Sequence, residues 1–366
     1  MIAAKEHFHG SDLEKIEQIY KIRKEEIIQF GANVNPLGLS GHFKSELSKN
    51  LDVICSYPDR EYLALRQDIA AYCHTDYSFC IVGNGSTELI AQSIQSLRPK
   101  KAMVIAPSYS EYENELKKAG SEITYFPLSE EDDFRLKTQK LFHALGKDCD
   151  LLICCNPNNP TSGFIPISDM KEILEYGRNE NITVIVDETY AEFTEDIRQV
   201  SAIPLVKEYE NLIVLRGISK FYAAPGLRLG YAITSNQKTR EEIVKALNPW
   251  SVNSVAATAA GILFRDEDFI RKTKKLIADE RRFCVEELNQ IKGLKVFNPS
   301  ANFVLVKITD ENRHSDELFD FCIRKKLMIR DCATFPYLNE QFFRFCFMKH
   351  EENILLLQAI KEFMEG

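Results

Sequence analysis

The stretch that decides the fold runs Ser219-Lys220-Phe221-Tyr222-Ala223-Ala224-Pro225-Gly226-Leu227-Arg228-Leu229-Gly230, and it follows an apolar run that ends at Leu215. Lone lysines are usually solvated surface residues, but Lys220 stands between a strand-like run and a Pro-Gly turn. A lysine that acts as a nucleophile needs a destabilised ammonium form, which partial burial beside other cations provides. Arg228, eight residues later, has a planar guanidinium that can hold a phosphate through two parallel hydrogen bonds. The stretch therefore predicts a nucleophilic lysine next to a phosphate site.

Three further polar motifs stand at the ends of apolar runs. Gly83-Asn84-Gly85-Ser86-Thr87 precedes a helical pattern, where flexible glycines and free N–H groups favour an anion. Asn156-Pro157-Asn158-Asn159-Pro160-Thr161-Ser162-Gly163 holds more turn-forming residues than one turn needs, which indicates a rigid loop that presents an amide to a ligand. Asp187 follows the apolar run 182–186, and Tyr190 lies three residues further on. Such a carboxylate either caps a helix or pairs with a protonated heterocyclic nitrogen.

Short apolar runs alternate with longer helical patterns through the middle of the chain. The expected strands are Ala102–Ala106, Leu151–Cys155, Thr183–Val186, Leu212–Leu215 and Leu229–Ile233. The expected helices between them include Thr87–Leu97, Glu111–Ala119 and Ser168–Arg178. This alternation predicts an α/β fold with a mainly parallel sheet and helices on both faces. Ligands of such sheets bind at the carboxyl ends of the strands, so we expect the polar motifs to converge there.

Three parts of the chain are expected. Residues 51–247 form a large domain, and residues 248–366 form a smaller α+β domain. After Asn248 a charged helical pattern over 271–288 is followed by short strands at 303–306, 327–330 and 342–347. The segment 1–50 is expected to pack with the small domain.

Composition narrows the class of protein. The 366 residues suit two closely joined domains, and the formal net charge of -8 argues against nonspecific nucleic-acid binding. None of the ten cysteines has a Cys-x-x-Cys partner or a metal-type spacing with histidine, so we expect reduced thiols, no metal site and a cytoplasmic location. The N-terminus lacks a signal-peptide pattern, and no apolar stretch approaches the roughly 18 residues of a membrane span.

Taken together, the motifs are more specific than any one of them. Asn-Pro-x-Asn-Pro-Thr, then Asp-x-x-Tyr, then Ser-Lys with an arginine eight residues later resembles the fold-type I family of pyridoxal 5'-phosphate (PLP) enzymes, over the chain from about His9 to Phe347. The resemblance implies that Lys220 holds the cofactor as a Schiff base and later moves protons, and that Asp187 pairs with the ring nitrogen. The other cofactor contacts that it implies are, at the phosphate, Gly85, Ser86, Thr87 and Arg228 and, at the ring, Tyr109, Asn159 and Tyr190.

Two further features concern the cofactor phosphate. Tyr57 resembles the family tyrosine that reaches the phosphate bound by the partner subunit, which implies a homodimer with shared active sites. Gly217 stands three residues before the lysine, where the family usually has Ser or Thr. One phosphate contact is therefore missing, or is replaced by Ser219 or water.

Within the family, the chain resembles two branches that act on phosphorylated amines, the threonine-phosphate decarboxylases of cobalamin biosynthesis and the histidinol-phosphate aminotransferases. Phe30-Gly31-Ala32-Asn33-Val34-Asn35-Pro36-Leu37-Gly38 is very similar to the decarboxylase pattern Phe-Ser-Ala-Asn-Ile-Asn-Pro-Leu-Gly. The other segments that resemble the decarboxylases more than the aminotransferases are 9–12, 220–228, 249–253 and 329–333. Tyr190 and Ser11-Asp12 depart from the decarboxylase pattern, which leaves the fine choice of substrate open.

Substrates of both branches carry a phosphate, so at least one cation should face it. By resemblance, Arg330 and His9, with Asn33 nearby, are expected at the substrate phosphate, and Arg344 at a substrate carboxylate. The alternatives are that Arg344 points outward from an edge strand and that His9 is only a surface group.

The sequence leads to the hypothesis that the chain decarboxylates L-threonine O-3-phosphate to (R)-1-aminopropan-2-yl phosphate. The bond held perpendicular to the cofactor plane is the one that breaks, so substrate orientation selects between decarboxylation and transamination. Histidinol-phosphate aminotransferase and L-serine O-phosphate decarboxylase activities stay open as alternatives. A cofactor-binding transcription regulator is disfavoured, because the first fifty residues overlap the substrate motifs and the chain is acidic.

Overall fold

The computed structural model describes residues 12–146 and 148–366. Its largest element is a seven-stranded sheet with the order β2-β8-β7-β6-β5-β3-β4, in which β8 alone runs antiparallel to its neighbours. Its strands are β2 (Cys80–Gly83), β3 (Lys101–Ala106), β4 (Glu122–Pro127), β5 (Leu151–Cys155), β6 (Thr183–Asp187), β7 (Leu212–Gly217) and β8 (Gly230–Ile233). The predicted mainly parallel sheet is confirmed.

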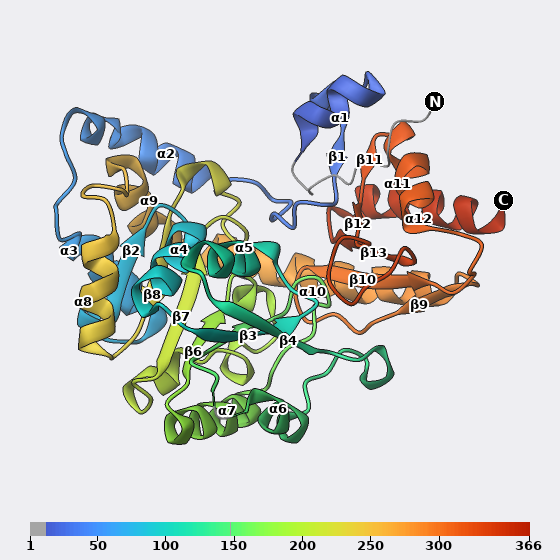
Figure 1. Ribbon diagram of the computed structural model, residues 1–366. Coiled ribbons are helices and arrows are strands. Elements are labelled where there is room, and N and C mark those ends of the chain that lie inside the picture. Colours follow the sequence, from blue (N-terminus) through green and yellow to red (C-terminus); the bar gives the residue numbers. More distant parts are fainter. Residues whose placement is uncertain (1–11, 147) are drawn as a thin grey trace.

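Side chains of the central strands alternate between two apolar clusters, one on each face of this sheet. Leu151 and Ile153 join the cluster that contains residues of α4 (Ser86–Leu97), α5 (Ser110–Ala119) and α8 (Gln237–Ala246). Leu152 and Cys154 join the cluster that contains residues of α6 (Thr138–Leu145) and α7 (Ile167–Glu180). Helices thus cover both faces (Figure 1), which explains why the strands are continuous apolar runs instead of alternating ones.

A second, smaller sheet lies on the right of Figure 1 and is antiparallel, with the order β12-β13-β10-β9. Its strands are β9 (Leu294–Val296), β10 (Phe303–Ile308), β12 (Arg330–Asp331) and β13 (Phe342–Cys346). The helices around it are α10 (Glu267–Asn289), α11 (Ser315–Arg324) and α12 (His350–Glu365).

The strand predicted at 327–330 is wrong as a single element. β11 (Leu327–Met328) pairs in parallel with β1 (Ile28–Gln29), whereas β12 pairs antiparallel with β13. The chain passes from one sheet to the other at Ile329, so the apolar run contains two short strands. This change of sheet puts Arg330 directly opposite Arg344.

The first fifty residues make contacts in two places. β1, which follows α1 (Leu13–Tyr20), joins β11, but α2 (Gly41–Lys49) packs against α9 (Ser254–Phe264), and α9 in turn packs against α3 (Leu63–Cys73). The domain boundaries at residues 50 and 247 stay a prediction. In the described part of the chain, no helix combines the length and the apolar character that crossing a membrane requires.

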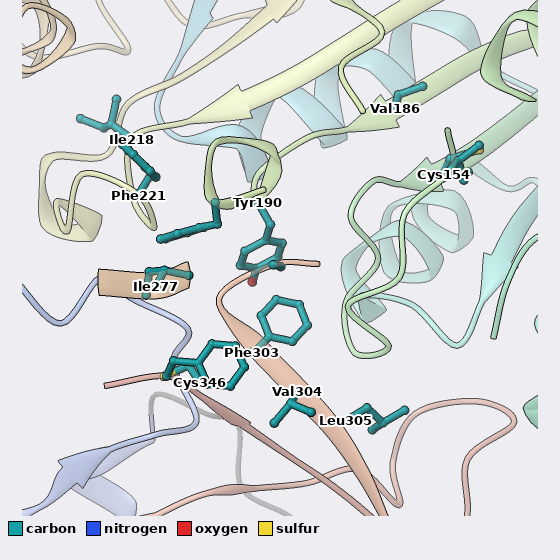
Figure 2. Close-up of a cluster of buried hydrophobic side chains, with 14 of the residues drawn as sticks. Cys154, Val186, Tyr190, Ile218, Phe221, Ile277, Phe303, Val304, Leu305 and Cys346 are labelled. Carbon is teal, nitrogen blue, oxygen red and sulfur yellow. The ribbon is translucent and has the colours of Figure 1, made fainter. Parts of the chain in front are cut away.

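One apolar cluster connects the two sheets. Figure 2 shows Cys154 and Val186 of the large sheet, Tyr190 and Phe221 from the segments after β6 and β7, and Phe303 of β10. The rings of Tyr190 and Phe303 meet edge to face with their centroids 4.9 Å apart. This shared core holds the small sheet next to the segments that follow β6 and β7.

Candidate active site

A pocket with a volume of about 370 Å³ lies where these segments meet. It brings together twelve of the residues predicted from the sequence: Asn33, Ser86, Thr87, Tyr109, Asn159, Asp187, Tyr190, Ser219, Lys220, Arg228, Arg330 and Arg344. These residues come from the segments at the carboxyl ends of β3, β5, β6 and β7, from the start of α4, from the small sheet and, for Asn33, from the N-terminal segment after Gln29. The polar motifs therefore share one cavity.

Lys220 follows β7 and is held from the other side of the pocket by the N-terminal segment. Its Nζ donates a hydrogen bond to the carbonyl oxygen of Ala32 at 2.7 Å. Burial, followed by the nearby Arg344 and Arg228 guanidinium groups, lowers the pKa of Lys220 to about 8. The neutral amine, which is the form that attacks a carbonyl carbon, is therefore far more abundant near neutral pH than in an ordinary lysine, although the ammonium form still predominates at pH 7.

Asp187, at the end of β6, is a buried carboxylate with 4% of its surface exposed. Its Oδ1 accepts hydrogen bonds from the Thr189 N–H at 2.9 Å and the Thr189 hydroxyl at 2.6 Å, and its Oδ2 accepts one from the Tyr112 hydroxyl at 2.7 Å. Burial raises the pKa of Asp187, and these hydrogen bonds oppose that shift. Among the described residues, no Lys, Arg or His forms an ion pair with it, so a cationic ligand would complete the site.

A cradle for an anion lies at the start of α4. Gly85 has φ of +87°, a backbone conformation that L side chains rarely adopt, and a Cβ at this position would meet the Arg228 guanidinium, so glycine is favoured there. Because Gly85 caps α4 without a side chain, the first N–H groups of the helix remain available to a phosphate. Gly217 and Ser219 also line the pocket, so a serine hydroxyl is available in the cavity although Gly217 has no side chain.

The asparagine-rich loop after β5 divides its side chains between structure and site. Asn156 exchanges hydrogen bonds with the backbone of Ile165, and Asn158 donates to the carbonyl oxygen of Pro107 at 2.9 Å. Asn159 instead lines the pocket, where its Oδ1 accepts a hydrogen bond from Nη1 of Arg344. The loop is held in place because Asn156 and Asn158 form hydrogen bonds with backbone groups of neighbouring segments.

Two guanidinium groups face the pocket from the small sheet. Arg344 is buried, donates to the carbonyl oxygen of Gly31 at 2.7 Å and lies 5.3 Å from the ring centroid of Phe303. The alternative of an outward-pointing Arg344 on an edge strand is wrong, because β13 lies between β12 and β10. Its cross-strand neighbour Arg330 donates to the Thr334 hydroxyl at 3.1 Å. Like charges facing each other across strands are destabilising, so the pair indicates an anionic ligand.

Three predicted residues are not among those that line the pocket. His9 lies outside the described residues. Gly85 directly precedes Ser86, which does line the pocket, and a Cβ on Gly85 would meet the Arg228 guanidinium. Tyr57 is 83% exposed, and its ring packs against Trp250 with centroids 5.1 Å apart.

Sequence reasoning missed other residues of the site, namely Tyr112, Thr189, Thr334 and Phe335. Tyr112 follows Tyr109 by one helical turn, and that spacing was a usable signal. Thr189 stands beside Asp187 in sequence. Thr334 and Phe335 belong to no motif and reach the site only because β12 ends next to it.

The residues present define the class of ligand. A partly neutral lysine suits an aldehyde, an unpaired buried carboxylate suits a protonated ring nitrogen, and the glycine cradle with Arg228 suits a phosphate. Pyridoxal 5'-phosphate combines these three groups, so Lys220, Asp187 and the start of α4 fit it. The fold and the pocket thus define a PLP-dependent enzyme.

Comparison with known proteins agrees with this class. The family Aminotransferase class I and II matches residues 25–360, so the chain belongs to this family, whose cofactor is PLP. The chain is similar to threonine-phosphate decarboxylase of Salmonella typhimurium, with 32% identity over 98% of this chain and 97% of that protein. It is also similar to histidinol-phosphate aminotransferase of Clostridium novyi, with 34% identity over 91% of each chain.

A solved structure shows the same fold. The histidinol-phosphate aminotransferase from Clostridium acetobutylicum superposes with a TM-score of 0.86 and 33% identity, over 91% of this chain and 98% of that chain. Relatives with two different reactions therefore match at similar identity.

Proposed function

We propose that this chain decarboxylates L-threonine O-3-phosphate to (R)-1-aminopropan-2-yl phosphate, a step of cobalamin biosynthesis. The observation that carries the proposal is the cross-strand pair Arg330 and Arg344, which line the same pocket as Lys220. L-Threonine O-3-phosphate has a phosphate and a carboxylate, so each guanidinium receives one anion. The similarity to the Salmonella decarboxylase supports the same assignment.

The side chains divide the work of such a reaction. PLP, when bound, supplies an electron sink for the bond that breaks. Arg330 binds the substrate phosphate and Arg344 binds the carboxylate, and together they fix the orientation that selects the bond. The electron pair left at Cα after carbon dioxide departs takes up a proton. Lys220, with its pKa lowered to about 8, can deliver that proton near neutral pH.

Transamination of histidinol phosphate is the second candidate, because the two Clostridium relatives match as well as the decarboxylase does. Histidinol phosphate has no carboxylate, so Arg344 would then serve the amino-acid partner of the reaction. Decarboxylation of L-serine O-phosphate is a nearer variant. That substrate lacks one methyl group, which changes binding by only about 1 kcal/mol.

The test is a product assay by mass spectrometry on the protein loaded with PLP. L-Threonine O-3-phosphate, L-serine O-phosphate and histidinol phosphate are each supplied with and without 2-oxoglutarate. Amine formation from threonine phosphate without 2-oxoglutarate, at the highest kcat/KM of the three, supports the proposal. Turnover of histidinol phosphate alone, and only with 2-oxoglutarate, overturns it in favour of the aminotransferase.

We also propose that the active protein is a homodimer in which Tyr57 reaches the partner's cofactor phosphate. Tyr57 is exposed and does not line the pocket of its own chain. Large apolar side chains are also exposed near Tyr57 in sequence, namely Leu51, Ile54 and Leu63. Trp250, which packs against Tyr57, is exposed too, as is Val244 of α8. Exposed apolar groups of this kind are typical of a subunit interface.

A further inference from the structure

The hydrogen bonds to Asp187 come from two residues that no motif marks. Tyr112, on α5, is fully buried and places its hydroxyl 2.7 Å from Oδ2. Burial and the adjacent Asp187 carboxylate raise the pKa of Tyr112 well above its ordinary value, so the hydroxyl stays protonated. Thr189 adds its N–H and its hydroxyl at Oδ1. All three partners act as donors, and donors stabilise a carboxylate over the neutral acid.

Counting lone pairs shows what remains for a ligand. An ionised carboxylate has about four acceptor sites, two on each oxygen. Thr189 occupies two sites on Oδ1, and Tyr112 occupies one on Oδ2. One acceptor site is therefore left, on the oxygen that Tyr112 also contacts. A single N–H donor from a cationic ring would satisfy it.

We propose that Tyr112 and Thr189 are positioning residues that keep Asp187 ionised and oriented before the cofactor arrives. Burial alone would favour the neutral acid, which cannot stabilise a ring cation, so the site depends on these donors. The inference goes beyond the proposed function, because it concerns cofactor binding and holds for either reaction.

The effect of the donors on the charge of Asp187 can be measured separately, because the neighbouring titratable groups do not obscure it. The other titratable groups of the described residues that face Asp187 are Tyr109, Cys155 and Tyr190, and burial raises the pKa of each. None of them changes charge in the neutral range. Lys220, whose pKa is about 8, also titrates in this range, but it is present in wild type and in every variant. Its effect therefore cancels when the PLP Kd of a variant is divided by the wild-type Kd at the same pH.

The experiment is titration of the cofactor-free protein with PLP, followed by absorbance, from about pH 6 to about pH 9. The variants are Tyr112→Phe, Thr189→Ala and the conservative Thr189→Ser. Tyr176→Phe is the matched control, because it removes a hydrogen bond from the Tyr176 hydroxyl on α7 to the Phe142 carbonyl on α6, and neither residue lines the pocket. Thermal melting of each cofactor-free variant checks its folding.

We expect Tyr112→Phe to raise the PLP Kd roughly tenfold relative to wild type at low pH, as for one lost hydrogen bond to a charged group. The ratio of the variant Kd to the wild-type Kd should fall toward one as pH rises, because Asp187 in the variant becomes ionised again at higher pH. Thr189→Ala should behave alike, and Thr189→Ser and Tyr176→Phe should match wild type.

A ratio of the Tyr112→Phe Kd to the wild-type Kd that is the same at every pH would mean that Tyr112 only packs, and would overturn the proposal. Kd values within twofold of wild type would also overturn it. If Tyr112→Phe fails to fold, the comparison of Thr189→Ala with Thr189→Ser decides alone. Cofactor binding is measured without turnover, so failure of the proposed reaction leaves this result unaffected.

Discussion

At the scale of single residues, the charges around Lys220 decide its chemistry. Burial and two guanidinium groups disfavour its ammonium form, and its pKa falls to about 8. A substrate carboxylate on Arg344 would offset one of those cations and make the amine more basic. If substrate binds as proposed, Lys220 would be a better nucleophile before substrate binds and a better proton carrier afterwards.

Lys220→Ala should remove the near-visible absorbance of the covalently bound cofactor. It should also lower turnover by about 10²- to 10⁴-fold, which is the contribution of a positioned acid–base group. Thermal melting of the cofactor-free protein should be close to wild type. Lys118→Ala, which removes an exposed amine of α5, is the control. An alanine variant that keeps turnover would contradict the assignment of Lys220.

The rate of covalent PLP capture by the cofactor-free protein should rise with pH and level off above a midpoint of about 8. The sign follows from burial, since a lowered lysine pKa means that the reactive neutral amine appears at lower pH than in a free lysine. Stopped-flow absorbance measures the rate. A midpoint near the ordinary lysine value of about 10.4 would show that the environment does not act as described.

Lys220 and Asp187 were predicted as pocket residues because they stand at or just after the end of an apolar strand, and Arg228 because it lies eight residues after Lys220. Tyr112 was not predicted as a partner of Asp187, because the two lie 75 residues apart and meet only when α5 packs on the sheet. Thr334 was missed for the same reason, since its hydroxyl gains a role only once Arg330 is placed on β12. Contacts of this kind depend on tertiary packing, which no local pattern encodes.

At the scale of elements, the ends of β6 and β7 are joined by a buried ion cluster. Arg216, the penultimate residue of β7, donates to Glu188 Oε2 through Nη2 at 2.7 Å and Nε at 3.0 Å, and lies 3.5 Å from Glu192. Glu188 directly follows Asp187, and Gly217 directly follows Arg216. The cluster thus fixes two adjacent strand ends that carry the pocket residues Asp187 and Gly217.

Arg216→Met should lower the free energy of unfolding by about 3–5 kcal/mol, because it leaves two buried carboxylates without their cation. Urea denaturation of the cofactor-free protein measures this. Arg178→Met, which breaks a largely exposed pair with Glu175, should cost no more than about 1 kcal/mol. Equal effects of the two substitutions would contradict the role of the cluster.

Five strands of the large sheet, β3, β5, β6, β7 and β8, were predicted, because both faces of the sheet are covered and these strands are continuous apolar runs. β2 and β4, at the two edges of the sheet, were not predicted. β5 has the predicted bounds, and α5 begins one residue before the predicted helix. The region around Ile329 was not predictable, since one apolar run serves two sheets and only the pairing partners β1 and β13 reveal the break.

At the scale of the whole molecule, the site is assembled from parts that lie far apart in sequence. The shared core around Tyr190 and Phe303 (Figure 2) holds the small sheet next to the segments that follow β6 and β7. Arg330 and Arg344 of the small sheet therefore line the same pocket as Lys220. Tyr57 remains outside this arrangement, which is the reason for proposing a second copy of the chain.

Mixing two defective variants tests that proposal. Tyr57→Ala and Lys220→Ala should each be weakly active or inactive, but a mixed dimer contains one site with both residues. Random exchange should restore roughly a quarter of the wild-type sites. Light scattering should give twice the chain mass of 42.0 kDa. Absence of any recovery after exchange, or a monomer mass at working concentration, would contradict shared sites.

The most direct test of the account follows the carboxyl carbon. The protein loaded with PLP is given L-threonine O-3-phosphate labelled with ¹³C at the carboxyl carbon, without any 2-oxo acid, and both products are measured by mass spectrometry. The account predicts one equivalent of labelled carbon dioxide for each unlabelled (R)-1-aminopropan-2-yl phosphate formed. In a parallel sample with 2-oxoglutarate, a labelled 2-oxo acid formed in place of labelled carbon dioxide would contradict it.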